Sequence, residues 1–192
     1  MPRYGKNLEE ILLKRNKALT KSNIFHLALN LLNILELVHS SGFVFNDLKP
    51  DNIMIDYGQK LCYSNDVEFE SSFNKLNFNL IDFGLASKWI DKVHGKHVAN
   101  KKQKYFKGNL SFSSVNQLAA QTSSRRDDLH SLIYLIIYLL NKNHLPLLME
   151  ALDKDKDLNS KRLSILRIKQ ANSLSQFSVN RAKCIQKLSR EI

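Results

Sequence analysis

Cysteine is scarce in this sequence of 192 residues. Only Cys62 and Cys184 occur, and two cysteines so far apart cannot supply a disulfide framework or the ligand set of a zinc site. Such a composition is typical of a protein from a reducing compartment. We therefore expect an intracellular location, in the cytoplasm or the nucleus.

Glycine is sparse as well. The six glycines stand apart from one another, at positions 5, 42, 58, 84, 95 and 108. Loops that cradle phosphates place several glycines close together, as in G-x-G-x-x-G. The sequence contains no loop of this kind.

Long hydrophobic runs are also missing. The longest, residues 132–140, covers only about half of a bilayer span, and it is better interpreted as a buried helix. At the start of the chain, Arg3 and Lys6 are followed by Glu9 and Glu10 instead of an apolar segment. We therefore expect neither a membrane span nor a secretory signal.

Acidic residues are outnumbered by basic ones. The 29 Lys and Arg against 18 Asp and Glu give a formal net charge of +11. A basic surface suits nucleic acid, an anionic membrane, or acidic and phosphorylated proteins, although most of the lysines can simply be solvated. Because the lysines are not interleaved with aromatic residues as in a nucleic-acid-binding module, we expect no nucleic acid as a partner.

A helical pattern interrupted by short strand-like segments makes up most of the chain. Asn7 and Glu10 form a capping pattern for a helix that ends near Asn16, and apolar residues recur at helical spacing over residues 22–40. Further helices are predicted at 147–152, 161–171 and 176–188, and short strands at 43–45 and 53–55. The pattern predicts a mainly α (α+β) fold.

Residues 56–77 differ in composition from their surroundings. They are rich in polar side chains, namely Ser64, Asn65, Asp66, Ser71, Ser72 and Asn74. Polar segments between two strands are typical of surface loops. We interpret this segment as a surface insertion without an assigned function.

The most informative stretch is residues 42–55, GFVFNDLKPDNIMI, which places Asp47, Lys49 and Asn52 close together, and a second acid, Asp82, follows in LIDFGLA. A carboxylate can accept a proton, an ammonium group can neutralise phosphate charge, and oxygen ligands suit Mg²⁺. Asp, Asn and Pro are also common in ordinary loops. Both strings in this order are nevertheless hard to obtain by chance.

The two strings resemble the catalytic loop and the metal-binding Asp-Phe-Gly turn of protein kinases. The resemblance implies that Asp47 is the catalytic base and that Lys49 contacts the transferring phosphate. It also implies ATP and Mg²⁺ as cofactors, with Asn52 and Asp82 as the metal ligands. Serine/threonine kinases carry Lys at the position of Lys49.

The first residues, MPRYGKNLEEIL, resemble the hinge and first lower-lobe helix of a casein kinase 1-like kinase. On this match, Tyr4 offers backbone groups to adenine and Met1 occupies the gatekeeper position. Met54 and Ile81 would line the nucleotide pocket. From their residue types alone, Met54 and Ile81 could equally be plain core residues.

Two later strings resemble the same family. Residues 108–116, GNLSFSSVN, are similar to its G-T-A-R-Y-A-S-x-N, and residues 124–132, SRRDDLHSL, follow its S-R-R-D-D-L-x-S-L. Asp128 lies where the family has a buried aspartate that ties down the catalytic loop, and it can also serve as a helix cap. The lysine-rich residues 92–107 would be the activation loop, which either docks acidic or pre-phosphorylated protein substrates or is simply solvated.

Three of the residues that depart from the family pattern lie at or near the catalytic loop of the resemblance. Phe45 and Asn46 replace the His and Arg of His-Arg-Asp, and Asn109 replaces a threonine that helps to align the base with the substrate hydroxyl. Phe45 can pack beneath Phe83 as an apolar substitute. Asn46 cannot respond to activation-loop phosphorylation as an arginine does.

The resemblance covers the hinge and the C-terminal lobe (C-lobe) of a kinase. Neither the Gly-rich strand of the N-terminal lobe (N-lobe) nor its paired lysine is found, so we expect residues 1–192 to be a partial kinase domain that lacks the N-lobe and belongs to a longer kinase. The predicted function is that of a casein kinase 1-type serine/threonine kinase. The alternative is a catalytically inactive, pseudokinase-like scaffold.

Overall fold

The computed structural model describes residues 3–91, 93–148, 150–152 and 157–172. The predicted helix at 176–188 and the gatekeeper position of Met1 lie outside the described residues. The helices are α1 (Leu8–Arg15), α2 (Lys21–Ser40), α3 (Asp66–Phe73), α4 (Val115–Leu118), α5 (Arg125–Leu140) and α6 (Leu158–Ala171). The strands are β1 (Tyr4–Asn7), β2 (Phe43–Val44), β3 (Ile53–Asp56), β4 (Phe78–Leu80), β5 (Ser87–Lys88), β6 (Ile90–Asp91) and β7 (Lys96–His97).

The strands form three small antiparallel sheets. The largest has the order β1–β3–β4, and β2–β5 and β6–β7 form two-stranded pairs. In the largest sheet, Ile53 lies opposite Leu80 and Ile55 opposite Phe78. The predicted short strands on both sides of the catalytic loop are therefore confirmed, and so is a mainly helical fold with small sheets.

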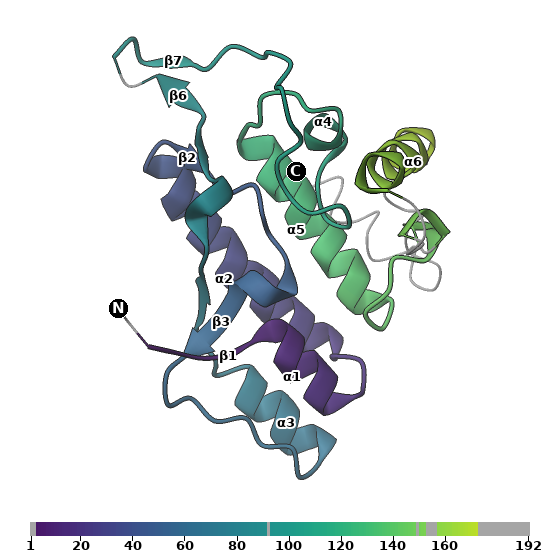
Figure 1. The fold of residues 1–192 in the computed structure, drawn as a ribbon. Helices are drawn as coiled ribbons and strands as arrows, with labels where there is room; N and C mark the ends of the chain where they lie inside the picture. The colour runs from purple at the N-terminus through teal and green to yellow at the C-terminus, as the bar shows by residue number, and fades with distance from the viewer. Residues whose placement is uncertain (1–2, 92, 149, 153–156, 173–192) are drawn as a thin grey trace.

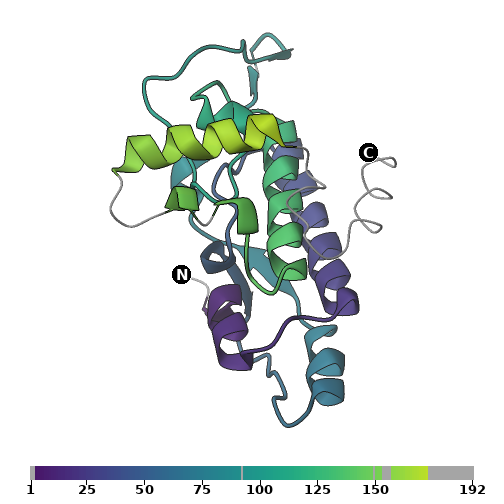
Figure 2. The same ribbon diagram turned by 90° about the vertical axis from the view of Figure 1, so that its right-hand side faces the viewer.

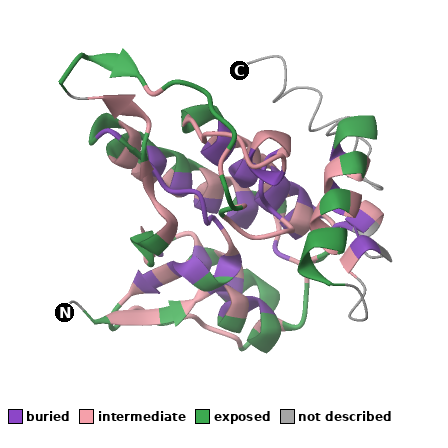
Figure 3. Cartoon of the chain, turned by 45° about the horizontal axis from the view of Figure 1, so that its top comes forward, coloured by how far each residue is buried: buried purple, intermediate pink, exposed green. Residues whose placement is uncertain are grey.

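Helices α2 and α5 lie side by side at the centre of the molecule (Figure 1). The apolar stripe of α2 is buried at Ile24, Leu27, Leu31 and Leu35, as its helical spacing predicts. The helix begins at Lys21 because Thr20 caps it, with the Thr20 hydroxyl accepting a bond from the backbone of residue 23. Figure 3 shows the buried residues gathered in the interior between the elements.

Helix α5 confirms the prediction of a buried helix for the longest apolar run. Its N-cap is Ser124, whose backbone N–H donates to the Asp127 carboxylate at 2.7 Å. The expectation that Asp128 could act as the cap is wrong. Asp127 takes part in the capping box because it stands three residues after the cap, which leaves Asp128 to point elsewhere.

Residues 56–77 contain a helix that their composition did not predict. Asn65 caps α3 through its side chain, and the polar residues of the segment surround two phenylalanines, Phe69 and Phe73, that are buried. The Arg15 guanidinium stacks 3.8 Å from the centre of the Phe69 ring. The segment therefore contributes to the core, because two aromatic rings one helical turn apart anchor it.

The last described elements pack against one another and against α4. The predicted helix at 147–152 is two short 3₁₀ turns, η3 (Pro146–Leu148) and η4 (Glu150–Leu152). Helix α6 begins at Leu158, earlier than predicted, because Asp157 caps it through two backbone N–H groups. Figure 2 shows α6 lying across α5 and beside α4. Across the described residues, no helix is both long enough and apolar enough to cross a membrane.

Candidate active site

Asp128 anchors the start of the catalytic loop. Its carboxylate is fully buried and accepts the backbone N–H of Phe45 at 2.8 Å and that of Asn46 at 2.8 Å. The ring nitrogen Nε2 of His39 lies 2.8 Å from the same carboxylate. The structure thus places Asp128 in the tying role that the sequence predicts, between α5, the end of α2 and the loop.

Three polar side chains surround the carboxylate of Asp47. Nδ2 of Asn52 and Nζ of Lys49 each lie 2.9 Å from Oδ2, and Nδ2 of Asn109 lies 3.2 Å from Oδ1. Asp47 is only 5% exposed. Because all three neighbours donate to its oxygens, they hold the carboxylate in a fixed orientation.

The structure brings Asn52 and Asp82 to neighbouring positions. The carbonyl of Asn52 accepts the N–H of Ile81 at 3.0 Å, which sets Asn52 beside the residue before Asp82. Asp82 adopts a left-handed backbone conformation, with φ 61°, and its exposed carboxylate accepts the N–H of Gly84 at 3.2 Å. These bonds define the tight turn that follows β4.

These two residues offer a donor set that fits Mg²⁺. Nδ2 of Asn52 donates both to the carbonyl and to the carboxylate of Asp47, so its amide oxygen is the atom left for a cation. Among the described residues there is no group of three or more His, Cys, Asp or Glu side chains that could hold a metal alone. One carboxylate and one amide oxygen suit a Mg²⁺ ion that is also held by substrate phosphates.

The three residues predicted to contact the nucleotide lie on or next to one sheet. Tyr4 is in β1 and pairs with Asp56 of β3, Met54 is in β3, and Ile81 follows β4. Each of the three is partly buried. The neighbours of Met54, Ile53 and Ile55, are buried in the core, so the alternation of a strand places Met54 on the opposite face.

Two aromatic rings connect the catalytic loop to the turn of Asp82. The ring of Phe45 meets the ring of Phe83 edge to face, with the centroids 5.1 Å apart. This geometry is favourable for aromatic pairs. The apolar substitution at Phe45 is therefore accommodated as the sequence predicts.

Comparison with known proteins decides the family. The model of the protein kinase domain matches residues 3–191. The chain belongs to the protein kinase family. It is also 32% identical, over 141 residues, to the casein kinase 1-like protein HD16 of Oryza sativa subsp. japonica. That alignment covers 73% of this chain and 18% of the rice protein, so the chain spans less than a fifth of that relative's length.

Asn46 joins the catalytic loop to residues 85–87 through neutral hydrogen bonds, which need no phosphorylated residue. Its Nδ2 donates to the carbonyl of Leu85 at 2.8 Å and to the hydroxyl of Ser87 at 2.9 Å. The amide of Gln117 in turn donates to the Asn46 carbonyl at 3.2 Å. In place of the usual arginine, a short neutral side chain thus fastens the catalytic loop to the segment after the Asp-Phe-Gly turn.

Asn109, which replaces a threonine of the family pattern, contacts Asp47. Besides contacting Asp47, its Nδ2 donates to the carbonyl of Leu48 at 3.1 Å. Its Oδ1 accepts the N–H of Phe112 at 2.7 Å. Unlike a threonine, an asparagine side chain provides a donor and an acceptor at separate atoms, so Asn109 contacts Asp47 and its own loop at the same time.

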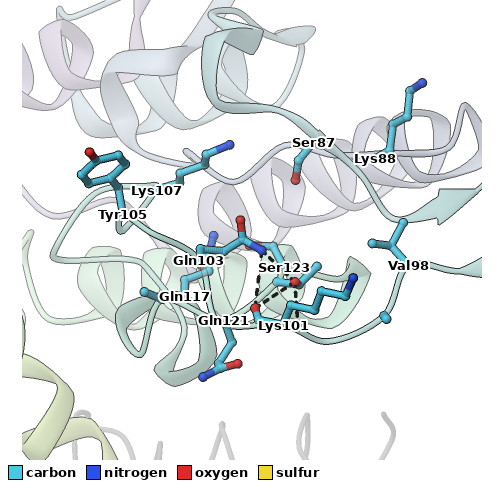
Figure 4. A pocket seen from close by; sticks show the side chains of 13 residues that line it. Ser87, Lys88, Val98, Lys101, Gln103, Tyr105, Lys107, Gln117, Gln121 and Ser123 are labelled. Carbon is cyan, nitrogen blue, oxygen red and sulfur yellow. Dashed lines mark hydrogen bonds between the residues drawn. The ribbon is translucent and has the colours of Figure 1, made fainter.

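A basic pocket of about 260 Å³ adjoins the catalytic loop (Figure 4). Lys88, Lys101 and Lys107 line it, together with Ser87 and Gln117, both of which also contact Asn46. The lysine density of residues 92–107 was visible in the sequence. That Lys101 and Lys107 line one hollow together with Lys88 was not, because it depends on the path of the chain between them.

Proposed function

We propose that this chain is the hinge and C-lobe of a serine/threonine protein kinase of casein kinase 1 type. Such an enzyme transfers the γ-phosphate of ATP to hydroxyl groups of protein substrates. The observation that carries the proposal is the setting of Asp47, a nearly buried carboxylate oriented by Lys49, Asn52 and Asn109. An acid held in this way is suited to receive a proton at a defined position.

In the proposed reaction, Asp47 accepts the proton of the substrate hydroxyl. The hydroxyl oxygen forms a bond to the γ-phosphorus, and the bond from that phosphorus to the oxygen of the ADP leaving group breaks. Lys49 donates to the transferring phosphate, and Asn52 and Asp82 would hold Mg²⁺. When bound, the ion neutralises charge on the phosphates.

The nucleotide would lie against the β1–β3–β4 sheet. We assign the adenine contact to the backbone of Tyr4 and the pocket wall to Met54 and Ile81. The sequence has no Gly-rich strand to cover the phosphates, so residues 1–192 act as a partial domain and the N-lobe comes from polypeptide outside them. Residues 56–77 are an insertion relative to this family.

The casein kinase 1 type rests on the strings at residues 108–116 and 124–132 and on the similarity to the rice protein. For the substrate class, the lysines around the basic pocket favour acidic or pre-phosphorylated proteins, since ammonium groups make charge-assisted bonds to carboxylates and phosphates.

The proposal is tested on the longer protein that contains this chain. We expect transfer of a labelled γ-phosphate to a serine-containing acidic protein, dependent on Mg²⁺ or Mn²⁺ and abolished in Asp82→Ala. Asp51→Ala, which removes an exposed carboxylate next to the same loop, is the matched control and should retain transfer. If the parent protein transfers no phosphate with either metal, the proposal is wrong and the scaffold alternative replaces it.

A further inference from the structure

Lys169 of α6 is buried beneath the loop that precedes α4. Lys169 is only 4% exposed. Its Nζ donates to the carbonyl of Ser111 at 2.8 Å and to that of Ser113 at 2.7 Å. Lysine is almost never buried this far unless its donors are satisfied. The two carbonyls belong to a single loop, so Lys169 fastens that loop to α6.

The third side of the ammonium group faces an aromatic ring. Nζ of Lys169 lies 3.6 Å from the centre of the Tyr134 ring on α5, within the range of a cation–π contact. Two carbonyls and one ring face match the three donors of an ammonium group. Burial lowers the pKa of Lys169 well below its ordinary value, yet the neutral amine still has two N–H donors for the same two carbonyls.

The loop that Lys169 holds is tightly folded. Gly108 has φ 124°, and a Cβ at this position would lie 2.5 Å from the Ser113 hydroxyl and 2.9 Å from the carbonyl of Asn46. Within the loop, the N–H groups of Phe112 and Ser113 both donate to Asn109, at 2.7 and 3.2 Å. These contacts restrict the conformation of the loop, and in this conformation Asn109 reaches Asp47.

We propose that Lys169 is a positioning residue for the catalytic base. It fixes the carbonyls of Ser111 and Ser113, the loop so fixed orients Asn109, and Asn109 orients Asp47. The inference rests on the proposed kinase function, and it extends the site to a helix that lies far along the chain. Lys169 touches neither Asp47 nor any reacting atom, so its effect on transfer passes through the loop.

The first test follows the loop itself and needs no activity. In the longer protein, Lys169→Met keeps the alkyl stem and removes the donors, so the amides of residues 112 and 113 should exchange hydrogen at least about tenfold faster while amides of α5 keep their protection. Arg167→Met, an exposed residue of the same helix, is the matched control. Unchanged exchange in Lys169→Met would overturn the proposal.

The second test uses steady-state kinetics and a double variant. We expect Lys169→Met to lower kcat for a protein substrate by about 10- to 100-fold and to leave KM for ATP unchanged, because a small misplacement of a catalytic group is costly. In the double variant Lys169→Met with Asn109→Ala, the loss of kcat should not exceed that of the worse single variant, since both substitutions act on the contact between Asn109 and Asp47. Multiplicative losses would assign Lys169 to general stability instead.

The outcomes separate this inference from the proposed function. If Lys169→Met speeds exchange in the loop but the parent protein transfers no phosphate, Lys169 still holds the loop and its role in catalysis is overturned. If Lys169→Met does not fold, Lys169→Gln, whose amide keeps a donor of shorter reach, takes its place in both tests. Failure of both variants to fold would show that Lys169 serves core stability, and the proposal would fall.

Discussion

Nδ2 of Asn109 lies 3.2 Å from Oδ1 of Asp47, although the two residues are 62 positions apart in the sequence. The contact occupies the oxygen of Asp47 that Lys49 and Asn52 leave open, since both of these bond to Oδ2. The carboxylate therefore has one fixed orientation relative to the loop that precedes α4. Asn109, which departs from the family pattern, is the residue that makes this contact.

Replacing Asn109 tests this substitution directly. Asn109→Ala removes both the contact with Asp47 and the acceptor for Phe112, and we expect kcat of the longer protein to fall by about 10- to 100-fold. Asn109→Thr restores a hydroxyl donor of the family type and should retain more activity than Asn109→Ala. Steady-state phosphorylation of a protein substrate measures both variants. Equal rates for Asn109→Ala and the parent would refute the alignment role.

Asp47→Asn tests the base. The change keeps the size of the side chain but removes its negative charge, so the proton of the substrate hydroxyl has no acceptor, and we expect kcat to fall by about 10²- to 10⁴-fold. Thermal unfolding should stay close to that of the parent. Asp51→Asn, two residues after Lys49 and exposed, controls for loss of one charge near the loop. An active Asp47→Asn enzyme would remove Asp47 from the reaction.

Asp128→Ala tests the anchor of the catalytic loop. The substitution leaves the N–H groups of Phe45 and Asn46 without their acceptor and His39 without its partner, in a fully buried setting. We expect the free energy of unfolding to fall by about 3–5 kcal/mol. Urea titration of the chain, followed by far-ultraviolet circular dichroism, measures the loss.

An exposed ion pair provides the comparison for Asp128. Asp66 lies 3.1 Å from Nζ of Lys17, and both side chains are largely solvated. Because surface pairs contribute about 0–1 kcal/mol, Asp66→Ala should cost far less than Asp128→Ala. Similar losses for the two variants would mean that Asp128 is not an anchor.

Local patterns in the sequence predicted much of this fold. The capping box of Asn7 and Glu10, the apolar stripe of α2 and the buried α5 each depend on residues within a few turns of one another, and each is found as expected. Helix α3 was missed because Phe69 and Phe73 are outnumbered by polar neighbours. Burial of these two rings outweighs the composition of the segment.

In the candidate site, too, the local features could be predicted from the sequence and the long-range contacts could not. The short strings around Asp47 and Asp82 contain the residues that the structure brings together, because a tight loop and a pair of adjacent strands hold them. The contacts of Asn109, Gln117 and Lys169 could not be predicted, since each joins segments that are distant in sequence and depends on the path of the chain between them.

Two tyrosines of α5 predict how stability changes in alkaline solution. Burial raises the pKa of Tyr134 to about 12 and, with the negative charges of Glu9 and Asp51, that of Tyr138 to about 12. In the unfolded chain a tyrosine ionises near pH 10. Between about pH 10 and pH 12 these two tyrosines thus bind fewer protons in the unfolded chain than in the folded one, and their contribution to stability must fall as the pH rises through this window.

Urea midpoints measured between pH 9 and pH 11.5 check this expectation. We expect the midpoint to decline above about pH 10.5, where Lys169, whose pKa burial lowers in the folded chain, is deprotonated in the unfolded chain as well. Tyrosinate absorbance should appear late and rise as the chain unfolds. Tyr138→Phe, which removes the hydroxyl of the ring that packs edge to face on Phe112, should make the decline shallower. Tyr57→Phe is the matched control, because it removes the hydroxyl of an exposed tyrosine, and it should leave the decline unchanged. If Tyr138→Phe leaves the slope as steep as in the parent, the phenol of Tyr138 ionises as freely in the folded protein as in the unfolded chain.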